Sequence, residues 1–210
     1  MNIVYIHGLD SDASSIKGLL LEHYCEQNHP DIAVYRPDLN QSPEQVFGDL
    51  IDLVTKLSKE ARTILVGSSL GGYFSTLISN HTGCSVLLLN PSTQPHITLQ
   101  RFYEESSVDN NLDSLNNSDA DTKVLYTTTG GWNITIADLK WFADHKLSGV
   151  EYPSQVVALI KEGDELLDPN LSVDFYRQYG AKVILQAEGD HRFSDFSEQL
   201  PVVMDIIQRL

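Results

Sequence analysis

The pentapeptide Gly67-Ser68-Ser69-Leu70-Gly71 follows the apolar run 63–66 and precedes the amphipathic run 72–78. A G-x-S-x-G sequence between a strand and a helix is typical of the nucleophile elbow in the α/β-hydrolase fold. Glycines two positions before and after the serine remove the Cβ atoms that would clash in so sharp a turn. We therefore predict that Ser69 is a nucleophile whose Oγ projects above the sheet edge, and that Ser68 packs inside.

A base should follow the nucleophile, because the chain order in this fold is Ser, then Asp or Glu, then His. The apolar run 181–187 ends in Glu188-Gly189-Asp190-His191, which places a histidine just beyond the carboxyl end of a strand. Ligand crevices of parallel sheets lie at that edge. We predict that His191 is the base among the seven histidines.

The acid is expected in the turn after the apolar run 155–160, where four carboxylates crowd together: Glu162, Asp164, Glu165 and Asp168. Asp164 follows a glycine soon after the strand, which suits a short and rigidly held carboxylate. Asp168 precedes Pro169, a pattern typical of a helix N-cap with proline at the first helical position. Asp164 is therefore the predicted acid, with Asp168 as the alternative.

The opening strand predicts an oxyanion hole. Residues 2–6 read as a buried strand that runs into His7-Gly8-Leu9. In an α/β-hydrolase the loop after such a strand gives one N–H, and the residue after the nucleophile gives the other. Leu9 and Leu70 are the predicted donors. We expect His7 to shape the loop rather than to transfer a proton.

Composition limits the partners. The 210 residues are enough for one domain with a sizeable core, so a single domain over 1–210 is predicted. The formal charge of −15 argues against nucleic acid and against an anionic membrane surface. Cys25 and Cys84 form no C-x-x-C pair, so neither a disulfide scaffold nor a metal site is expected. With no signal-peptide pattern and no apolar run of membrane-spanning length, the expected location is cytoplasmic.

The whole chain alternates short β-branched runs with longer amphipathic ones, which indicates βαβ units and a mostly parallel sheet. We expect six strands in the spatial order 2-1-3-4-5-6, with helices on both faces. The expected strands are 2–6, 32–36, 63–67, 85–89, 155–160 and 182–187, and the expected helices are 14–28, 43–59, 71–81, 170–179 and 197–209.

One segment, about 91–153, separates two consecutive strands by more than a crossover needs, so it is predicted to be an insertion after the fourth strand. Its part from Ser106 to Thr122 is rich in Asp, Asn and Ser and reads as a flexible loop. The run 136–143 reads as a helix. Two interpretations stay open: a cap above the nucleophile, with Trp141 and Phe142 contacting substrate, or a helix packed on the sheet rim.

Six motifs together resemble the small bacterial esterases of the YqiA/YcfP type, and the resemblance spans nearly the whole chain: His7-Gly8-Leu9, Gly67 to Tyr73, Asn90-Pro91, Asp138-Leu139-Lys140, Gly163 to Asp168 and Gly189 to Phe193. The resemblance implies a compact α/β-hydrolase with esterase or thioesterase activity, in which Ser69, His191 and Asp164 are nucleophile, base and acid. The polar stretch between Asn90-Pro91 and Asp138 matches no family motif, so the resemblance does not define the substrate.

The sequence therefore predicts a serine hydrolase that cleaves small-molecule esters or thioesters through an acyl-enzyme, without metal or organic cofactor. Three alternatives remain. A thioesterase uses the same constellation as an esterase, and a hydrolase-fold binding protein would keep the sheet without activity. A peptidase is less expected, because amide cleavage needs a cleft that positions a chain and protonates a poor leaving group. The oligomeric state is not predicted.

Overall fold

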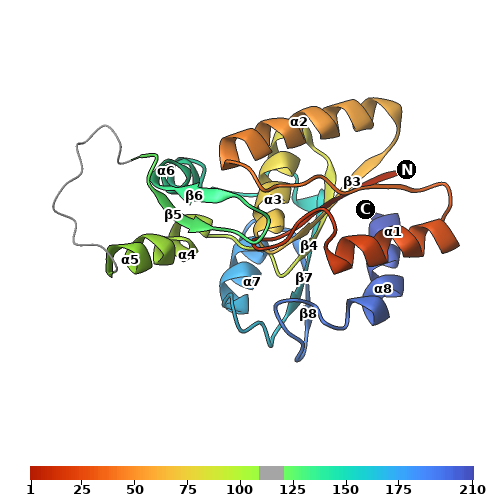
Figure 1. Cartoon of the computed structure of the whole chain (residues 1–210). Helices are drawn as coiled ribbons and strands as arrows, with labels where there is room; N and C mark the ends of the chain where they lie inside the picture. The colour runs from red at the N-terminus through yellow and green to blue at the C-terminus, as the bar shows by residue number, and fades with distance from the viewer. Residues whose placement is uncertain (109–120) are drawn as a thin grey trace.

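The computed structural model describes residues 1–108 and 121–210, and its centre is a six-stranded sheet (Figure 1). All neighbouring strands are parallel, in the order β2-β1-β3-β4-β7-β8. The strands are β1 (Asn2–Ile6), β2 (Ala33–Tyr35), β3 (Thr63–Ser68), β4 (Ser85–Leu89), β7 (Val156–Lys161) and β8 (Lys182–Gln186). Because β3 lies inside the sheet, the residue that follows it sits in the middle of the carboxyl edge.

Helices cover both faces of the sheet, because successive residues of a strand point to opposite faces. Val4 and Leu65 belong to a core shared with α2, α3 and α7, whereas Tyr5 and Val66 belong to a core shared with α1 and α8. These helices are α1 (Ile16–Asn28), α2 (Pro43–Glu60), α3 (Leu70–Thr82), α7 (Pro169–Gln178) and α8 (Phe196–Arg209). Strands buried on both faces explain the near-continuous apolar runs in the sequence.

The segment between β4 and β7 forms a separate layer at one side of the sheet (Figure 1). It contains α4 (Pro95–Thr98), α5 (Gln100–Val108), the antiparallel pair β5 (Val124–Thr127) and β6 (Asn133–Thr135), α6 (Ile136–Asp144) and the short 3-10 helix Pro153–Gln155. The predicted helix 136–143 is α6, while α4, α5 and the β5–β6 hairpin were not predicted. Most of the predicted loop 106–122 lies outside the described residues.

The predicted fold is confirmed. Every predicted strand and helix outside the insertion is found within two residues of its expected ends, and the predicted strand order is the observed one. No helix that the described residues form has the length and apolar character needed to cross a membrane.

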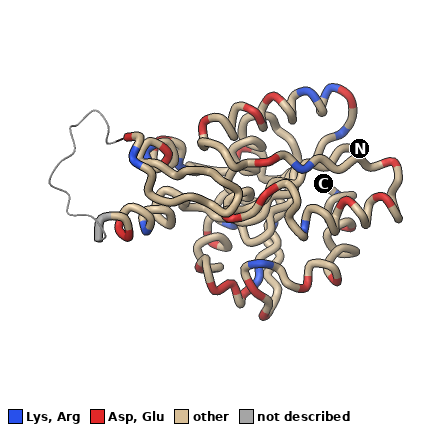
Figure 2. Tube along the Cα trace, viewed as in Figure 1, with Lys and Arg blue, Asp and Glu red and all other residues tan. Residues whose placement is uncertain are grey.

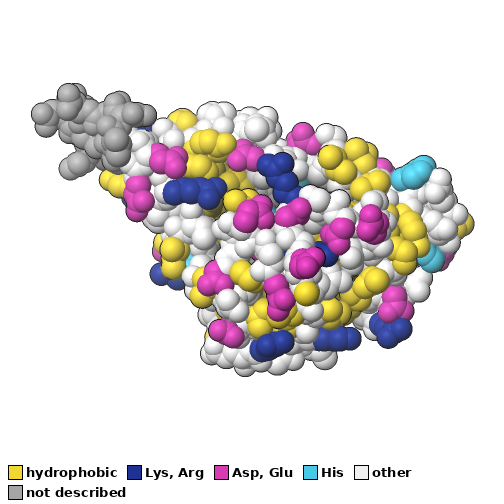
Figure 3. Space-filling model, turned by 90° about the horizontal axis from the view of Figure 1, so that it is seen from below, with side chains coloured by type: hydrophobic (Ala, Val, Ile, Leu, Met, Phe, Trp, Pro, Cys, Tyr) yellow, Lys and Arg dark blue, Asp and Glu magenta, His cyan; other side chains and the backbone are white. Residues whose placement is uncertain are grey.

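The surface is mainly acidic. Figure 2 shows Asp and Glu along the outer sides of most helices, with fewer Lys and Arg between them. On the face seen in Figure 3, acidic side chains are spread widely, and hydrophobic groups lie between them. This distribution agrees with the formal charge of −15.

Candidate active site

Ser69 occupies a sharp turn between the end of β3 and the start of α3. Its backbone has φ 54° and ψ −119°, a conformation that L-residues rarely adopt. A Cβ on Gly67 would lie 2.2 Å from Ser75 Oγ, and one on Gly71 would lie 2.1 Å from the Ile6 oxygen. Close packing around the turn therefore requires both glycines, in agreement with the expectation that a Cβ at either position would clash.

His191 links the predicted nucleophile and acid. Its Nε2 lies 2.9 Å from Ser69 Oγ, and its Nδ1 lies 2.8 Å from Asp164 Oδ2. The histidine side chain is 11% exposed and that of Asp164 is 2% exposed. With Nδ1–H donating to the carboxylate, Nε2 can accept the hydrogen bond of the serine hydroxyl. The structure thus brings these three predicted residues together in the expected chain of contacts.

The two candidate acids have different environments. Asp164 Oδ1 accepts hydrogen bonds from the N–H groups of Leu166 (2.9 Å) and Leu167 (2.8 Å), which leaves Oδ2 for His191. Asp168 is the N-cap of α7, where its side chain accepts from the Asn170 N–H at 2.9 Å. The geometry therefore favours Asp164 over Asp168 as the partner of the histidine.

Two further residues, Asn90 and Glu165, hold the His191 segment, and this role was not predicted for either of them. Asn90 follows β4 and donates from Nδ2 to the main-chain oxygens of Asp190 (3.0 Å) and His191 (3.3 Å). Glu165 accepts a hydrogen bond from the His191 N–H at 3.0 Å. Asn90 had a detectable signal, because it is a polar residue directly after an apolar strand. Glu165 was one of four carboxylates in the same turn, and nothing local distinguished its role.

The predicted oxyanion loop lies against the serine. A Cβ on Gly8 would lie 3.1 Å from Ser69 Cβ. His7 is buried: its Nε2 accepts from the Leu39 N–H at 3.0 Å, so its Nδ1–H donates to the Gly8 oxygen at 2.8 Å. In a trans peptide the oxygen of Gly8 and the N–H of Leu9 point in opposite directions. His7 therefore turns the Leu9 N–H away from its own ring.

The second predicted donor starts a helix. Leu70 is the first residue of α3, so its N–H has no acceptor within the helix. Leu9 and Leu70 line the same crevice as Ser69 and His191, and within the described residues neither N–H makes a hydrogen bond. Both N–H groups thus remain available to a ligand.

The crevice in front of Ser69 and His191 has a volume of about 780 Å³, within the range typical of small-molecule sites. Its walls combine apolar side chains with hydroxyl and charged groups. The apolar lining comprises Leu9, Ile16, Leu20, Leu70, Leu99, Leu166, Leu167, Phe193 and Phe196. No cluster of three or more metal-ligating side chains occurs in the described part of the chain.

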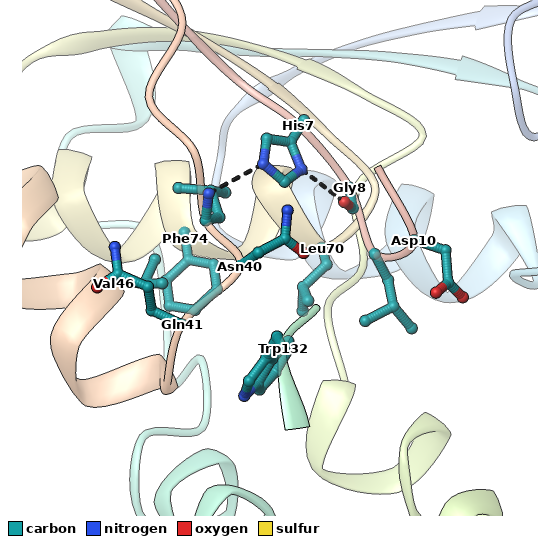
Figure 4. Close-up of a pocket in the computed structure, with 11 residues that line it drawn as sticks. His7, Gly8, Asp10, Asn40, Gln41, Val46, Leu70, Phe74 and Trp132 are labelled. Atoms are coloured by element: carbon teal, nitrogen blue, oxygen red, sulfur yellow. Dashed lines mark hydrogen bonds between the residues drawn. The ribbon is translucent and has the colours of Figure 1, made fainter. Parts of the chain in front are cut away.

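A much smaller pocket is lined in part by the segment from His7 to Asp10 (Figure 4). Leu9 and Leu70 border it as well as the main crevice, and Trp132 of the insertion forms one of its walls. Its volume of about 10 Å³ suffices for roughly one water molecule. This pocket is therefore too small for an acyl chain, and the main crevice is the candidate substrate site.

Trp141 and Phe142, which were expected to contact substrate, pack on neighbouring helices and do not line the crevice. Phe142 is fully buried and packs on the rings of Tyr73 (5.5 Å between centroids) and Phe74 (6.1 Å). Trp141 stacks on His145 at 3.9 Å, and neither residue lines the crevice or the small pocket. Both side chains dock α6 on the helical layer, which corresponds to the rim interpretation for this helix.

Other parts of the insertion do border the crevice. Thr98 and Leu99 come from the α4–α5 segment, Arg101 comes from α5, and Thr129 comes from the hairpin turn. The residues of the insertion that line the crevice are thus not the two aromatic residues that the sequence suggested, because packing against α3 is not visible in the helical period.

Residues 2–208 match the family described as "Uncharacterised protein family (UPF0227)". The chain belongs to this family. Membership over almost the full length confirms the resemblance to the YqiA/YcfP type that the motifs indicated. The family's description names no reaction, so it does not define the chemistry of the crevice.

Solved structures of low identity share the fold. They include a putative hydrolase of the α/β superfamily from Xanthomonas campestris pv. campestris, with 15% identity, TM-score 0.62 and coverage of 100% of this chain and 99% of that chain. Alpha/beta hydrolase domain-containing protein 10 from mouse has 19% identity, TM-score 0.68 and coverage of 99% and 90%. Est1E from Butyrivibrio proteoclasticus, with ferulic acid bound, has 13% identity, TM-score 0.71 and coverage of 99% and 88%. These likenesses confirm the α/β-hydrolase fold.

Proposed function

We propose that this protein is a serine hydrolase that cleaves carboxylic esters or thioesters, with Ser69 as nucleophile, His191 as base and Asp164 as acid. The observation that carries the proposal is the chain of contacts from Asp164 Oδ2 to His191 Nδ1 (2.8 Å) and from His191 Nε2 to Ser69 Oγ (2.9 Å). A serine with a purely structural role would not need the strained φ of 54° that Ser69 has.

In the proposed reaction, His191 Nε2 takes the Ser69 proton while Oγ attacks the carbonyl carbon. The tetrahedral intermediate collapses when the leaving alkoxide or thiolate takes that proton from His191, which leaves an acyl-enzyme. Water, deprotonated by His191, then releases the acid and restores Ser69. Asp164 stabilises the imidazolium that forms in each half of the reaction.

The developing oxyanion would accept hydrogen bonds from the N–H groups of Leu9 and Leu70, and each such donor typically lowers the barrier by about 3 kcal/mol. His7 supports this role because its hydrogen bond to the Gly8 oxygen fixes the orientation of the peptide between Gly8 and Leu9. The Leu9 N–H then points away from the His7 ring. The ferulic acid bound to Est1E is consistent with a crevice that accepts small organic acids in this fold.

The decisive test is labelling with a fluorophosphonate, followed by mass spectrometry of the peptide that carries the label. We expect modification of Ser69, loss of labelling in Ser69→Ala and retention in Ser68→Ala, because Ser68 is buried. A label on Ser68, or no label on a folded protein, would contradict the proposal. The second outcome is the one that a hydrolase-fold binding protein would give.

Ester and thioester activity are separated by a panel in which the acyl group is held constant and only the leaving atom changes. The same triad serves both, so the contacts of Ser69 do not favour either. A higher kcat/KM for the thioester, after correction for its intrinsic reactivity, would make thioester hydrolysis the main activity.

A further inference from the structure

The charged residues of the crevice differ from those of the whole chain. The complete sequence has 14 Lys and Arg against 29 Asp and Glu, and acidic positions are more frequent than basic ones along the trace in Figure 2. Within the described residues, however, the lining of the crevice includes three cations, Lys17, Arg101 and Arg192, and only two acids, Asp10 and Asp12. The lining of the crevice therefore carries a small excess of cations in a protein whose sequence is strongly acidic.

Hydrogen bonds within the protein engage both of these acids. The Asp10 carboxylate accepts from the Tyr126 hydroxyl and from the Thr129 N–H, each at 3.1 Å. Asp12 Oδ1 accepts from both the N–H and the hydroxyl of Ser14. Neither acid lies within 4.0 Å of a crevice cation in the described structure. Among the residues that the structure describes, the three cations therefore form no direct ion pair, and Asp190 acts on Lys17 at longer range.

Lys17 and Arg192 lie together beside the candidate base. Lys17 Nζ donates to the main-chain oxygen of Arg192 at 2.7 Å, and residue 192 directly follows His191. Burial lowers the pKa of Lys17 to about 8, while the nearby Asp190 charge opposes that shift. Lys17 is therefore mainly protonated at pH 7, although its surroundings disfavour the charge. A bound anion would offset this cost.

The first turn of α1 adds partial positive charge to the same place. Ser15 is the N-cap of α1, yet its side chain makes no cap hydrogen bond, and the first turn contains no acidic residue. Ser15 Oγ is shielded from solvent and lies beside the Tyr5 hydroxyl, so it is turned toward β1 and not toward the N–H groups of the helix. A 13-residue helix directs its unpaired N–H groups and dipole at whatever lies before this turn.

We propose that Lys17, Arg192 and the first turn of α1 form a subsite for an anionic group of the substrate, a carboxylate or a phosphate. The subsite adjoins His191, so the anion would sit beside the carbonyl that Ser69 attacks. This inference rests on the proposed hydrolase function and adds a substrate class to it: esters or thioesters that carry a negative charge near the scissile bond.

The charge could be on either side of that bond, and two pairs of substrates distinguish the sources. The acyl side is tested with the 4-nitrophenyl ester of hexanoic acid against the mono-4-nitrophenyl ester of adipic acid. The leaving-group side is tested with phenyl acetate against 3-carboxyphenyl acetate. In each pair, the measured quantity is the ratio of kcat/KM for the anionic ester to kcat/KM for the neutral one.

Three variants and one control locate the subsite. Lys17→Met and Arg192→Met remove a charge at nearly constant length, and the Lys17 hydrogen bond to the Arg192 main chain survives the second change. Arg101→Met removes the third cation, on α5. Lys56→Met removes a charge from an exposed residue of α2 that does not line the crevice, and controls for the change in net charge.

We expect a ratio above one in at least one pair, and a fall of about tenfold in Lys17→Met and Arg192→Met, as for the loss of a charge-assisted hydrogen bond. Arg101→Met should lower the ratio less, and Lys56→Met should leave it unchanged. Any of three results would overturn the subsite and leave the hydrolase proposal intact. The first is a ratio near one in both pairs, and the second is an equal fall of the ratio in Lys17→Met and Lys56→Met. The third is a larger fall of the ratio in Arg101→Met than in the other variants.

Failure of the hydrolase proposal gives a different result, namely no turnover of any ester and no labelling of Ser69. The subsite is then measured by calorimetry on Ser69→Ala with the same four intact esters. Tighter binding of an anionic ester than of its neutral partner, lost in the Ser69→Ala, Lys17→Met double variant, would support the subsite. Equal binding of both partners would refute it.

Discussion

Asn90 Nδ2 donates a hydrogen bond to the main-chain oxygen of His191 at 3.3 Å, so the end of β4 holds the segment that carries the candidate base. The same nitrogen donates to the Asp190 oxygen at 3.0 Å, and Asn90 Oδ1 accepts from the Lys161 N–H at 2.8 Å. One buried amide thus joins β4, the end of β7 and the loop after β8. This arrangement places His191 over Ser69, although the two are far apart in sequence.

Asn90→Asp tests this link, because aspartate keeps the size and the acceptor but loses the donor. Two carbonyl oxygens would then face a carboxylate, so we expect a loss of about 1 to 3 kcal/mol in the free energy of unfolding. We also expect kcat to fall at least tenfold as His191 moves, measured by hydrolysis of a 4-nitrophenyl ester.

Asn80→Asp is the matched control for Asn90→Asp. Asn80 has the same bonding pattern away from the site, since Nδ2 donates to the Gly149 oxygen and Oδ1 accepts from the Glu151 N–H, both at 2.9 Å. It should lose stability and keep kcat. Similar kcat losses in both variants would show that Asn90 acts on general stability and not on His191.

Asp164→Asn should lower kcat by about three to four orders of magnitude, because a neutral amide cannot stabilise the His191 imidazolium. Asp168→Ala should instead cost about 1 kcal/mol of stability through loss of the α7 N-cap and keep most activity. Steady-state kinetics and thermal unfolding of both variants provide the comparison. The opposite pattern would transfer the acid role to Asp168.

The sequence predicted those features of the site that depend on neighbouring residues in the chain. Ser69, Asp164 and His191 each follow an apolar strand and carry turn glycines nearby, so the order of strands was enough to bring them together. The contacts of Asn90 and Glu165 with the His191 segment join residues from separate loops, which no spacing reveals. Trp141 and Phe142 were assigned to the substrate because large aromatics favour pockets, whereas both pack on Phe74 of α3, which buries Phe142 fully and Trp141 in part.

The hairpin turn between β5 and β6 restrains the loops around the crevice. A Cβ on Gly130 would lie 2.0 Å from Asn40 Nδ2, and Asn40 is itself bound to the Ser11 oxygen and to Thr128 Oγ1. We expect Gly130→Ala to displace Asn40 and to raise KM, with the effect measured on one neutral ester. Gly48→Ala, where a Cβ meets open space in α2, should keep KM and gain up to about 1 kcal/mol of stability.

Trp141→Ala should destabilise the fold without changing acyl-chain preference. Its ring stacks on His145 and packs near Phe47 and Phe74, so its removal should cost about 3 kcal/mol in the free energy of unfolding. Leu99→Ala, which alters the crevice lining, should raise KM more for a longer acyl ester, because each buried methylene contributes about 0.8 kcal/mol. A chain-length effect in Trp141→Ala equal to that in Leu99→Ala would restore Trp141 to the acyl site.

Lys17 also predicts a pH dependence. Because burial lowers its pKa to about 8, Lys17 is charged below that pH and neutral above it, with Asp190 and Arg192 as the charged neighbours that act on it. The preference for an anionic over a neutral ester should therefore fall as pH rises through about 8. A ratio of kcat/KM values cancels the titration of the shared catalytic groups, and it reports the free enzyme.

Lys17→Arg and Lys17→Met bracket this pH effect. Arginine stays charged, so its ratio should remain constant from pH 6.5 to pH 9.5, and methionine should give a low ratio at every pH. The free energy of unfolding depends on pH in the opposite direction. The pKa of Lys17 is 10.5 in the unfolded chain, so between pH 8 and 10.5 the unfolded chain binds more protons than the folded protein. The contribution of Lys17 to the free energy of unfolding therefore rises with pH in this range. A wild-type ratio that does not change across pH 8 would mean that Lys17 does not contact the anionic group.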